Sequence, residues 1–531
     1  MTKKATRRKA SRPKSLLYDG SEWDFETMQR TYAAIEEIAR DDLGLDVYPN
    51  QIEIISSEQM LDAYCSIGMP LMYQHWSFGK RFVREEELYR KGYQGLAYEI
   101  VINSSPCISY YMEENTMAMQ TLVMAHAAFG HNHFFKNNYL FQQWTDADGI
   151  LDYLEFAKHY IADCEERHGT TAVEDILDAA HALMDQGVFR YRRSPKPNLR
   201  EQEKRRRERE AYYERHYNDL WRTLPETKAD EEAGVDEKEL AERKKQLKLP
   251  EENILYFIQK NSPTLEVWQR ELLRIVRNIA QYFYPQKQTK VMNEGCATFV
   301  HHYITSKLFD EGLISEGVLL EILHSHSNVV AQPSFDDPRY SGINPYALGF
   351  AMMQDIKRIC TEPDEEDRAW FPAIAGTGDW RAILKDAWAN YRDESFIKQF
   401  LSPKLIRDFK LFRFTDDTKD DHVTVREIHN ERGYEEVRNA LARSYEISAV
   451  EPDIQIVDVD LQGDRELVLR HGVRNDVPLA DKARDDVLAY VRQLWGYGAR
   501  LEGVDLESGK TLYTSPTAKA ADGDAAFDIT F

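Results

Sequence analysis

Cysteine is scarce in this chain and forms no CxxC pair. Only five cysteines occur among 531 residues, at Cys65, Cys107, Cys164, Cys296 and Cys360. An odd and widely scattered set of this kind is typical of reduced thiols rather than of disulfides. We therefore expect the protein to reside in the reducing environment of the cytoplasm.

Long hydrophobic runs are also missing. A membrane-spanning helix needs roughly 18 apolar residues in succession, and no run approaches that length in a chain whose mean hydropathy is −0.60. The basic N-terminal stretch MTKKATRRKASRPK is not followed by an apolar segment, so it does not have the pattern of a secretory signal. These features predict a soluble globular protein without a membrane span.

Positive charge is in deficit over most of the chain. The net charge of −22 argues against general nucleic-acid binding through the folded body. Residues 1–14 are the exception, because they carry seven basic side chains and no acidic one. One interpretation of this tail is a disordered solubilising arm, and the other is a tether to an anionic surface or polymer.

The periodicity of the sequence predicts an α+β protein with a predominantly helical N-terminal domain. Helical spacing dominates residues 15–409, while QIEII (residues 51–55) and AYEIVINSSPCISYY (97–111) predict short strands of a small sheet. Residues 200–250 are dense in charge and poor in apolar residues. We interpret them as an exposed helical or partly disordered insertion, which could be a partner-binding surface.

Residues 410–531 predict a smaller C-terminal α+β domain of hairpins and helices. Three stretches, which begin at residues 409, 454 and 499, alternate apolar and polar side chains on both sides of a turn, and each predicts a hairpin. Helical segments at 434–445 and 480–495 separate them. The expected order is therefore ββαββαββ, and we expect a binding or docking role because no catalytic signature appears there.

Several catalytic motifs are absent, but histidines are clustered. The chain has no P-loop spacing, no GxSxG and no convincing dinucleotide fingerprint. In contrast, TLVMAHAAFGHNHFFKNN places His126, His131 and His133 within eight residues, and imidazole is a common ligand of zinc, iron and nickel. An ideal α-helix would hold His126 and His131 about 140° apart, so the three can share an ion only if the helix is distorted, for instance at Gly130.

A glutamate in the segment KVMNEGCATFVHHYI (residues 290–304) is the second candidate for a metal ligand. Asn293 could cap a helix that starts there, and a carboxylate in the first turn would suit the helix dipole. This alternative explains Glu294 without a metal. However, Glu294 and His301 share one face of the helix, and the small residues Gly295 and Ala297 would let another helix approach closely.

Four stretches of the chain resemble the SpoVR family, the stage V sporulation protein R-like proteins. The resemblance rests on HWSFGKRF (residues 75–82), YEIVINSSPCISYYMEENTMAMQTLVMAHAAFGHNHFFKNN (98–138), MNEGCATFVHHYI (292–304) and GINPYALGF (342–350). It covers nearly the whole chain after the basic tail. It implies a bacterial protein of spore cortex formation or of stationary-phase and starvation responses. It also implies that a PrkA-type serine kinase and a von Willebrand factor A-like protein accompany the chain.

The element NEGCA is also similar to the Asn-Glu-Gly-x-Ala element of gluzincin metallopeptidases, whose glutamate is the third zinc ligand. This looser resemblance implies a zincin-like fold that holds zinc or another divalent transition metal. The expected ligands are His126, one or both of His131 and His133, and Glu294, and His301 is expected nearby. Gluzincins also need HExxH, in which the glutamate activates water. This chain has Ala127 at that position, and its second histidine is displaced.

Another catalytic base would then be required. Glu113 and Glu114 stand at the predicted strand-to-helix junction before His126, although a continuous helix would place Glu114 about 18 Å away. Two hypotheses follow. The first is a metal-dependent hydrolase of an amide or peptide bond, and the second is a non-catalytic regulator with a degenerate metalloprotease-like fold.

Overall fold

The computed structural model describes residues 15–65, 72–76, 83–84, 99–191, 247, 249–335, 337–412, 414–415, 424–425, 430–447, 451–461, 463–474 and 478–515. The predicted basic tail, most of the charged insertion and most of HWSFGKRF lie outside these residues. The chain divides into two compact units. Unit 1 comprises residues 1–174 and 281–451, and unit 2 comprises residues 175–280 and 452–531. The predicted boundary at residue 410 therefore lies within unit 1, and the chain passes to unit 2 at residue 452.

Unit 1 is predominantly helical, as predicted. Its first half contains α1 (Phe25–Glu37), η1 (Ile38–Asp42), β1 (Asn50–Ile55), α2 (Ser57–Cys65), β2 (Glu99–Ile102), β3 (Cys107–Met112), α4 (Met117–Val123), η2 (Met124–His131), α5 (Asn132–Asn137), α6 (Tyr139–Trp144) and α7 (Ile150–His168). Its second half contains α14 (Lys290–Asp310), α15 (Glu316–Val329), α16 (Pro345–Thr361), α17 (Glu365–Trp370), α18 (Trp380–Asn390), α19 (Asp393–Phe400), α20 (Pro403–Asp408), β4 (Phe414–Thr415), β5 (Thr424–Val425) and α21 (Glu431–Ser444).

The predicted small sheet is present in unit 1. Its strand order is β1-β3-β2, in which β1 runs parallel and β2 antiparallel to β3. The β2–β3 pair confirms the two short strands predicted around the Ser-Ser-Pro turn. Strand β2 lies at an edge of this sheet and packs against η2.

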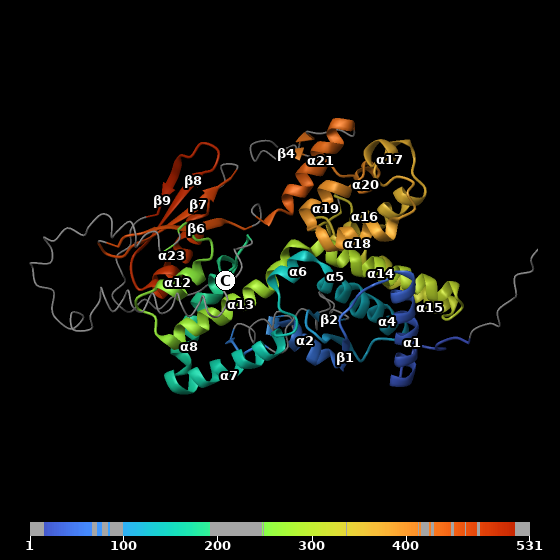
Figure 1. Cartoon of the computed structure of the whole chain (residues 1–531), viewed down its shortest axis with the longest axis horizontal. Coiled ribbons are helices and arrows are strands. Elements are labelled where there is room, and N and C mark those ends of the chain that lie inside the picture. Colours follow the sequence, from blue (N-terminus) through green and yellow to red (C-terminus); the bar gives the residue numbers. More distant parts are fainter. Residues whose placement is uncertain are drawn as a thin grey trace, which may run out of the picture. The chain divides into compact units, whose positions relative to one another are not determined.

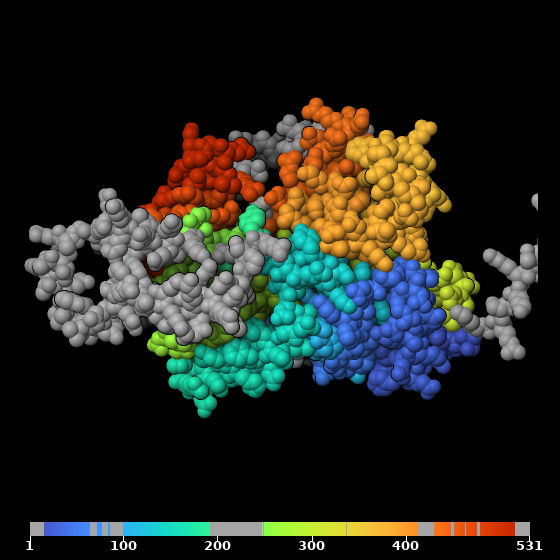
Figure 2. All heavy atoms as spheres, in the orientation of Figure 1, coloured from blue at the N-terminus to red at the C-terminus, as the bar shows by residue number. Residues whose placement is uncertain are grey.

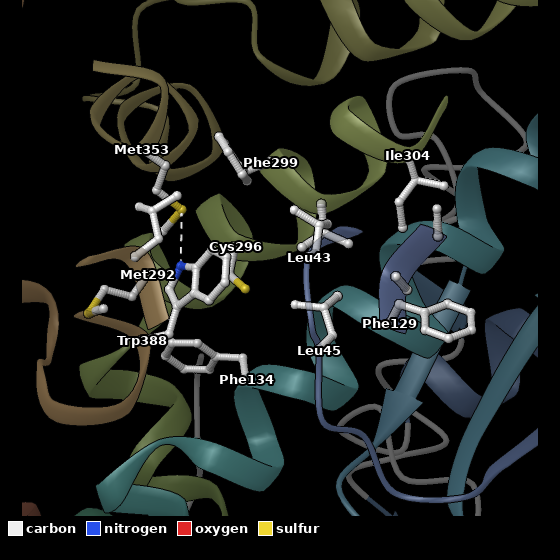
Figure 3. Packing of buried hydrophobic residues seen from close by; sticks show 14 of the residues in the cluster. Leu43, Leu45, Phe129, Phe134, Met292, Cys296, Phe299, Ile304, Met353 and Trp388 are labelled. Carbon is white, nitrogen blue, oxygen red and sulfur yellow. Dashed lines mark hydrogen bonds between the residues drawn. The ribbon is translucent and has the colours of Figure 1, made fainter. Parts of the chain in front are cut away.

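Helix α14 lies at the centre of the unit 1 core. It packs against η2 and against α16, and Figure 1 shows it, in yellow-green, between the teal helices and the gold ones. Its buried residues occur around its whole circumference, as expected for a helix that is enclosed by other helices. Figure 3 shows Met292, Cys296 and Phe299 of α14 packed with Trp388, whose Nε1 lies 3.4 Å from the sulfur of Met353.

The N-terminal helices join the second half of unit 1 at the surface. Arg381 Nε donates a hydrogen bond of 2.8 Å to the carbonyl of Asp42, and Lys307 forms an ion pair of 3.2 Å with the Asp42 carboxylate. In the space-filling view the blue N-terminal residues accordingly adjoin the gold segment (Figure 2). Segments that are far apart in sequence thus enclose one core.

Unit 2 is built on a four-stranded sheet of order β6-β7-β8-β9. The strands β6 (Asp453–Val459) and β7 (Leu467–Val473) pair antiparallel, β7 and β8 (Ala499–Asp505) pair parallel, and β8 and β9 (Thr511–Thr514) pair antiparallel. Helix α23 (Asp481–Trp495) connects β7 to β8 and packs against β8. Two of the predicted hairpins are thereby confirmed. The unit also contains η3 (Met184–Gln186) and α12 (Ile254–Asn261), while α8 (Thr170–Ala182) and α13 (Val267–Gln288) run from one unit into the other.

Among the described residues, the elements from β4 onward occur in the order β4, β5, α21, β6, β7, α23, β8 and β9. The first pair, β4 and β5, is antiparallel, and the residues between these strands lie outside the described part of the chain. Together the two units make an α+β protein, as the periodicity predicted.

Candidate metal centre

Two histidines that are five residues apart lie side by side. Helix α4 continues directly into η2, a π-helix, in which the N–H of Asn132 donates to the carbonyl of Ala127, five residues earlier. A π-helix holds more residues in each turn than an α-helix, so residues five apart come close to the same face. The rings of His126 and His131 consequently lie 4.7 Å apart between their centroids. The helix distortion that the sequence analysis required for His126 and His131 to meet is this π-helical turn, which includes Gly130.

Glu294 faces both of these histidines from α14. Its Oε2 lies 3.6 Å from His131 Nε2 and 4.0 Å from His126 Nε2. This oxygen is buried and has no hydrogen-bond partner. A buried carboxylate oxygen without a partner is costly, so a group that binds it would stabilise the site.

Glu294 is not a residue of the first helical turn. Helix α14 begins at Lys290, three residues before the predicted start, and the carboxylate of Asp393 accepts hydrogen bonds of 2.9 Å from the N–H groups of Val291 and Met292. Asn293 is therefore not the cap of this helix. Its Oδ1 instead lies 2.9 Å from Nδ1 of His131, which directs Nε2 of that ring toward Glu294.

Close helix approach brings the two motifs together. A Cβ atom on Gly130 of η2 would lie 2.5 Å from Cα of Ala297 on α14, and a Cβ on Gly295 would lie 2.6 Å from Cα of Gly349 on α16. No side chain fits at these glycines. The expected role of the small residues Gly295 and Ala297 in a close approach is thus confirmed.

A second carboxylate reaches the histidines from the sheet. Glu99 at the start of edge strand β2 places Oε1 3.6 Å from His126 Nε2. Glu99, His126 and His131 form a group whose ligand atoms all lie within 4.8 Å of one another and could hold a metal ion. The sequence analysis missed Glu99, because a single glutamate in an alternating strand carries no metal signature.

The other predicted site residues occupy different positions. His301 is buried beside His126, with 2.9 Å between their Nδ1 atoms. His133 points elsewhere, since its Nδ1 is hydrogen-bonded to the backbone of Asp46. Glu113 and Glu114 are exposed, and Oε1 of Glu114 accepts a hydrogen bond from the N–H of Ser57 at the start of α2.

Comparison with known proteins identifies the family. The profile of the family described as SpoVR like protein matches residues 22–450. The chain belongs to the SpoVR family. The profile described as SpoVR-like C-terminal domain matches residues 452–506, so the two SpoVR matches meet where the chain passes into unit 2 for the last time.

A bacterial relative supports the same conclusion. This SpoVR chain is 56% identical over 486 residues to the uncharacterized protein YcgB of Escherichia coli strain K12. The aligned region covers 92% of this chain and 93% of YcgB. No solved structure matches the chain. Within the described residues, none of the helices is both long and apolar enough to span a bilayer.

The electrostatics of this SpoVR site suit a cation. Burial raises the pKa of Glu99 to about 8, and the nearby Glu294 carboxylate contributes to the increase. Burial and the neighbouring imidazoles lower the pKa of His126 well below its usual value. His126 is therefore neutral, which is the form that binds metals. Glu99 carries a proton at neutral pH when no cation is present, and a cation would replace that proton.

The spacing of the donor atoms also fits a small cation. Ligand atoms about 2.0–2.2 Å from a tetrahedral zinc lie roughly 3.3–3.6 Å from one another. The separations of 3.6 Å for Glu99–His126 and His131–Glu294, and of 4.0 Å for His126–Glu294, are close to these values. Small side-chain shifts would complete the coordination.

Proposed function

We propose that this SpoVR protein is a metal-dependent hydrolase whose metal is held by His126, His131 and Glu294. The observation that carries the proposal is the buried, unpartnered Oε2 of Glu294, which faces Nε2 of both histidines. Three protein ligands and an open position are the usual arrangement of a catalytic zinc site. Zinc or another divalent transition metal would polarise the scissile carbonyl and lower the pKa of a bound water.

Glu99 is our candidate for the general base. Its carboxyl group lies beside His126, and a cation that replaces its proton would leave a carboxylate able to accept one from water. Oε1 would accept a proton from the attacking water and then donate it to the leaving nitrogen. We prefer Glu99 to Glu113 and Glu114, because these two are exposed and Glu114 binds the start of α2.

The proposed substrate class is an amide or peptide bond, as in a peptidoglycan precursor. The family resemblance motivates this choice, since SpoVR-like proteins are associated with the spore cortex or with stationary-phase stress. The proposed place of action is the cytoplasm, in agreement with the few scattered cysteines.

Metal content tests the proposal directly. Protein purified without chelators should contain one equivalent of a divalent transition metal by mass spectrometry. His126→Ala and Glu294→Gln should both lose it, whereas His324→Ala should keep it, because His324 is exposed on α15. Native protein without metal, or equal metal in all four samples, would contradict the proposal.

A second candidate function is a non-catalytic regulator that keeps a metal site. Ala127 is fully buried and occupies the position of the missing HExxH glutamate, which favours a degenerate enzyme. In this case the partners would be a PrkA-type serine kinase and a von Willebrand factor A-like protein. Deleting residues 201–246 should then abolish capture of the kinase, while His126→Ala should leave it intact. Loss of capture by a folded His126→Ala protein would oppose this candidate.

A further inference from the structure

Three buried imidazoles form a continuous chain that leads away from the candidate metal centre. Nδ1 of His126 on η2 lies 2.9 Å from Nδ1 of His301 on α14. Nε2 of His301 lies 2.9 Å from Nδ1 of His326 on α15. All three side chains are buried, and no acidic group takes part in either contact. The metal-facing Nε2 of His126 is thus linked to a ring two helices away.

The two contacts constrain where the protons lie. A neutral imidazole carries one N–H and one acceptor nitrogen, and each contact of 2.9 Å needs one donor and one acceptor. Only two arrangements satisfy both contacts. In the first, His126 donates from Nδ1 to His301, and His301 donates from Nε2 to His326. In the second, every proton is reversed, so that His326 donates to His301, His301 donates to His126, and the proton of His126 is on Nε2.

We infer that His301 and His326 are positioning residues that set which nitrogen of His126 is free to bind the metal. This inference rests on the proposed metal site. A metal on Nε2 requires the first arrangement, whereas the Glu294 carboxylate that faces Nε2 favours a proton on this nitrogen and therefore the second. Metal binding therefore reverses the direction of both hydrogen bonds among the three histidines. His126 releases its Nε2 proton to solvent at the site, His301 passes its Nδ1 proton to Nδ1 of His126, and His326 passes its Nδ1 proton to Nε2 of His301. His326 takes up one proton from solvent at Nε2, so all three rings stay neutral.

The surroundings keep the rings uncharged. Burial lowers the pKa of His301 well below its usual value and that of His326 to about 4, and neighbouring imidazoles, including His302, add to both effects. The rings of His302 and Phe350 flank His326, with centroids 5.0 Å and 4.7 Å away. The environment thus disfavours any imidazolium that would break the donor–acceptor order.

Solid-state nitrogen NMR of histidine-labelled full-length protein shows directly which ring nitrogens carry protons. Protonated and unprotonated ring nitrogens have distinct shifts, and the variants below assign the resonances. Without metal, His126 should be protonated at Nε2 and His326 at Nδ1. After loading with Zn²⁺, the protons should be on Nδ1 of His126 and on Nε2 of both His301 and His326. Unchanged protonation of His301 and His326 on loading would overturn the inference.

Measurements of zinc affinity distinguish a role of His301 in positioning His126 from a role in packing alone. In competition with a chromophoric chelator, His301→Leu should weaken Zn²⁺ binding roughly 10–100-fold, the usual effect of losing a partner of a metal-binding histidine. His301→Asn should restore most of the affinity, because its Oδ1 replaces the acceptor Nδ1. His324→Leu, on the same helix as His326 but exposed, should bind Zn²⁺ as the native protein does. Equal affinities for His301→Leu and His301→Asn would contradict a positioning role.

Measurements on the metal-free protein distinguish a failure of this inference from a failure of the proposed function. If native protein binds no Zn²⁺, the metal site is wrong and reversal cannot occur. The coupling itself is still tested in the metal-free spectrum by His126→Leu, which removes the acceptor of His301 Nδ1–H. His301 should then carry its proton on Nε2 and donate it to His326, so the protonated nitrogens of both rings should change. Unaltered His301 and His326 signals in that variant would show that the rings are merely packed together.

Discussion

His126 and His131 lie with their ring centroids 4.7 Å apart, although five residues separate them. The π-helical turn η2 makes this possible, and Glu294 faces both rings from α14. π-Helical turns are rare and occur frequently at functional sites. In the proposed metal site, the turn would take the place of the four-residue spacing by which HExxH proteins bring two histidines to one metal.

The two carboxylates of the site should have separable roles. Glu294→Gln should weaken Zn²⁺ binding at least tenfold, because it removes a ligand charge that faces both histidines. Glu99→Gln should change the affinity much less but abolish hydrolysis, because an amide cannot accept the proton. Isothermal titration with Zn²⁺ measures the first effect. Equal loss of affinity in both variants would make Glu99 a ligand rather than a base.

The contribution of Glu99 to the stability of the metal-free protein should fall as pH rises, whereas the buried histidines with lowered pKa values contribute a slope of the opposite sign. The pKa of Glu99 is about 8 in the folded protein, against an ordinary value near 4.3. The folded state therefore holds a proton that the unfolded chain releases, and its stabilising effect is complete below about pH 4 and lost as pH approaches 8. The full loss is on the order of 5 kcal/mol.

Thermal melts between pH 5 and pH 8 in the presence of a chelator measure this dependence. Glu99→Gln should flatten it, although Asp393, whose pKa burial raises to about 7, contributes a residual slope of the same sign in both proteins. An identical pH profile for native and Glu99→Gln protein would exclude a proton held by Glu99.

Substitution of Gly130 should move the histidines of η2 away from Glu294 of α14. Its Cβ would lie 2.5 Å from Cα of Ala297, so Gly130→Ala should force η2 away from α14 and destabilise the fold by about 1–3 kcal/mol. Zn²⁺ binding should weaken as well. Gly317→Ala on α15 is the control, since its Cβ would meet only Ser315 Oγ, at 3.9 Å, and a helical alanine should slightly raise stability. A Gly130→Ala protein as stable as the control would be inconsistent with the close approach.

Asn293 should position His131 as His301 positions His126. Asn293→Leu removes the Oδ1 acceptor 2.9 Å from His131 Nδ1 and should weaken Zn²⁺ binding about 10-fold or more. Asn293→Asp keeps an oxygen at the same place and should therefore bind Zn²⁺ more tightly than Asn293→Leu does. The ratio of the two dissociation constants is the measurement, and a ratio near one would remove Asn293 from the site.

The sequence by itself determined the fold class, the small sheet, the C-terminal hairpins and the family. Each depends on local patterns, such as the alternation in residues 454–472 or long motifs like GINPYALGF, which hold wherever the segment lies in space. The candidate residues His126, His131 and Glu294 were also recognisable, because their side-chain chemistry is unusual in apolar segments.

Only the tertiary structure decided which of these residues meet. A π-helical turn depends on packing around it, so the sequence showed only that His126 and His131 could meet if the helix were distorted. The start of α14 depends on Asp393, which lies about a hundred residues away in the chain and binds Val291 and Met292. Glu99 joins the site only because β2 is at the sheet edge beside η2. Distances between segments that are remote in sequence are set by close packing, and no local pattern encodes them.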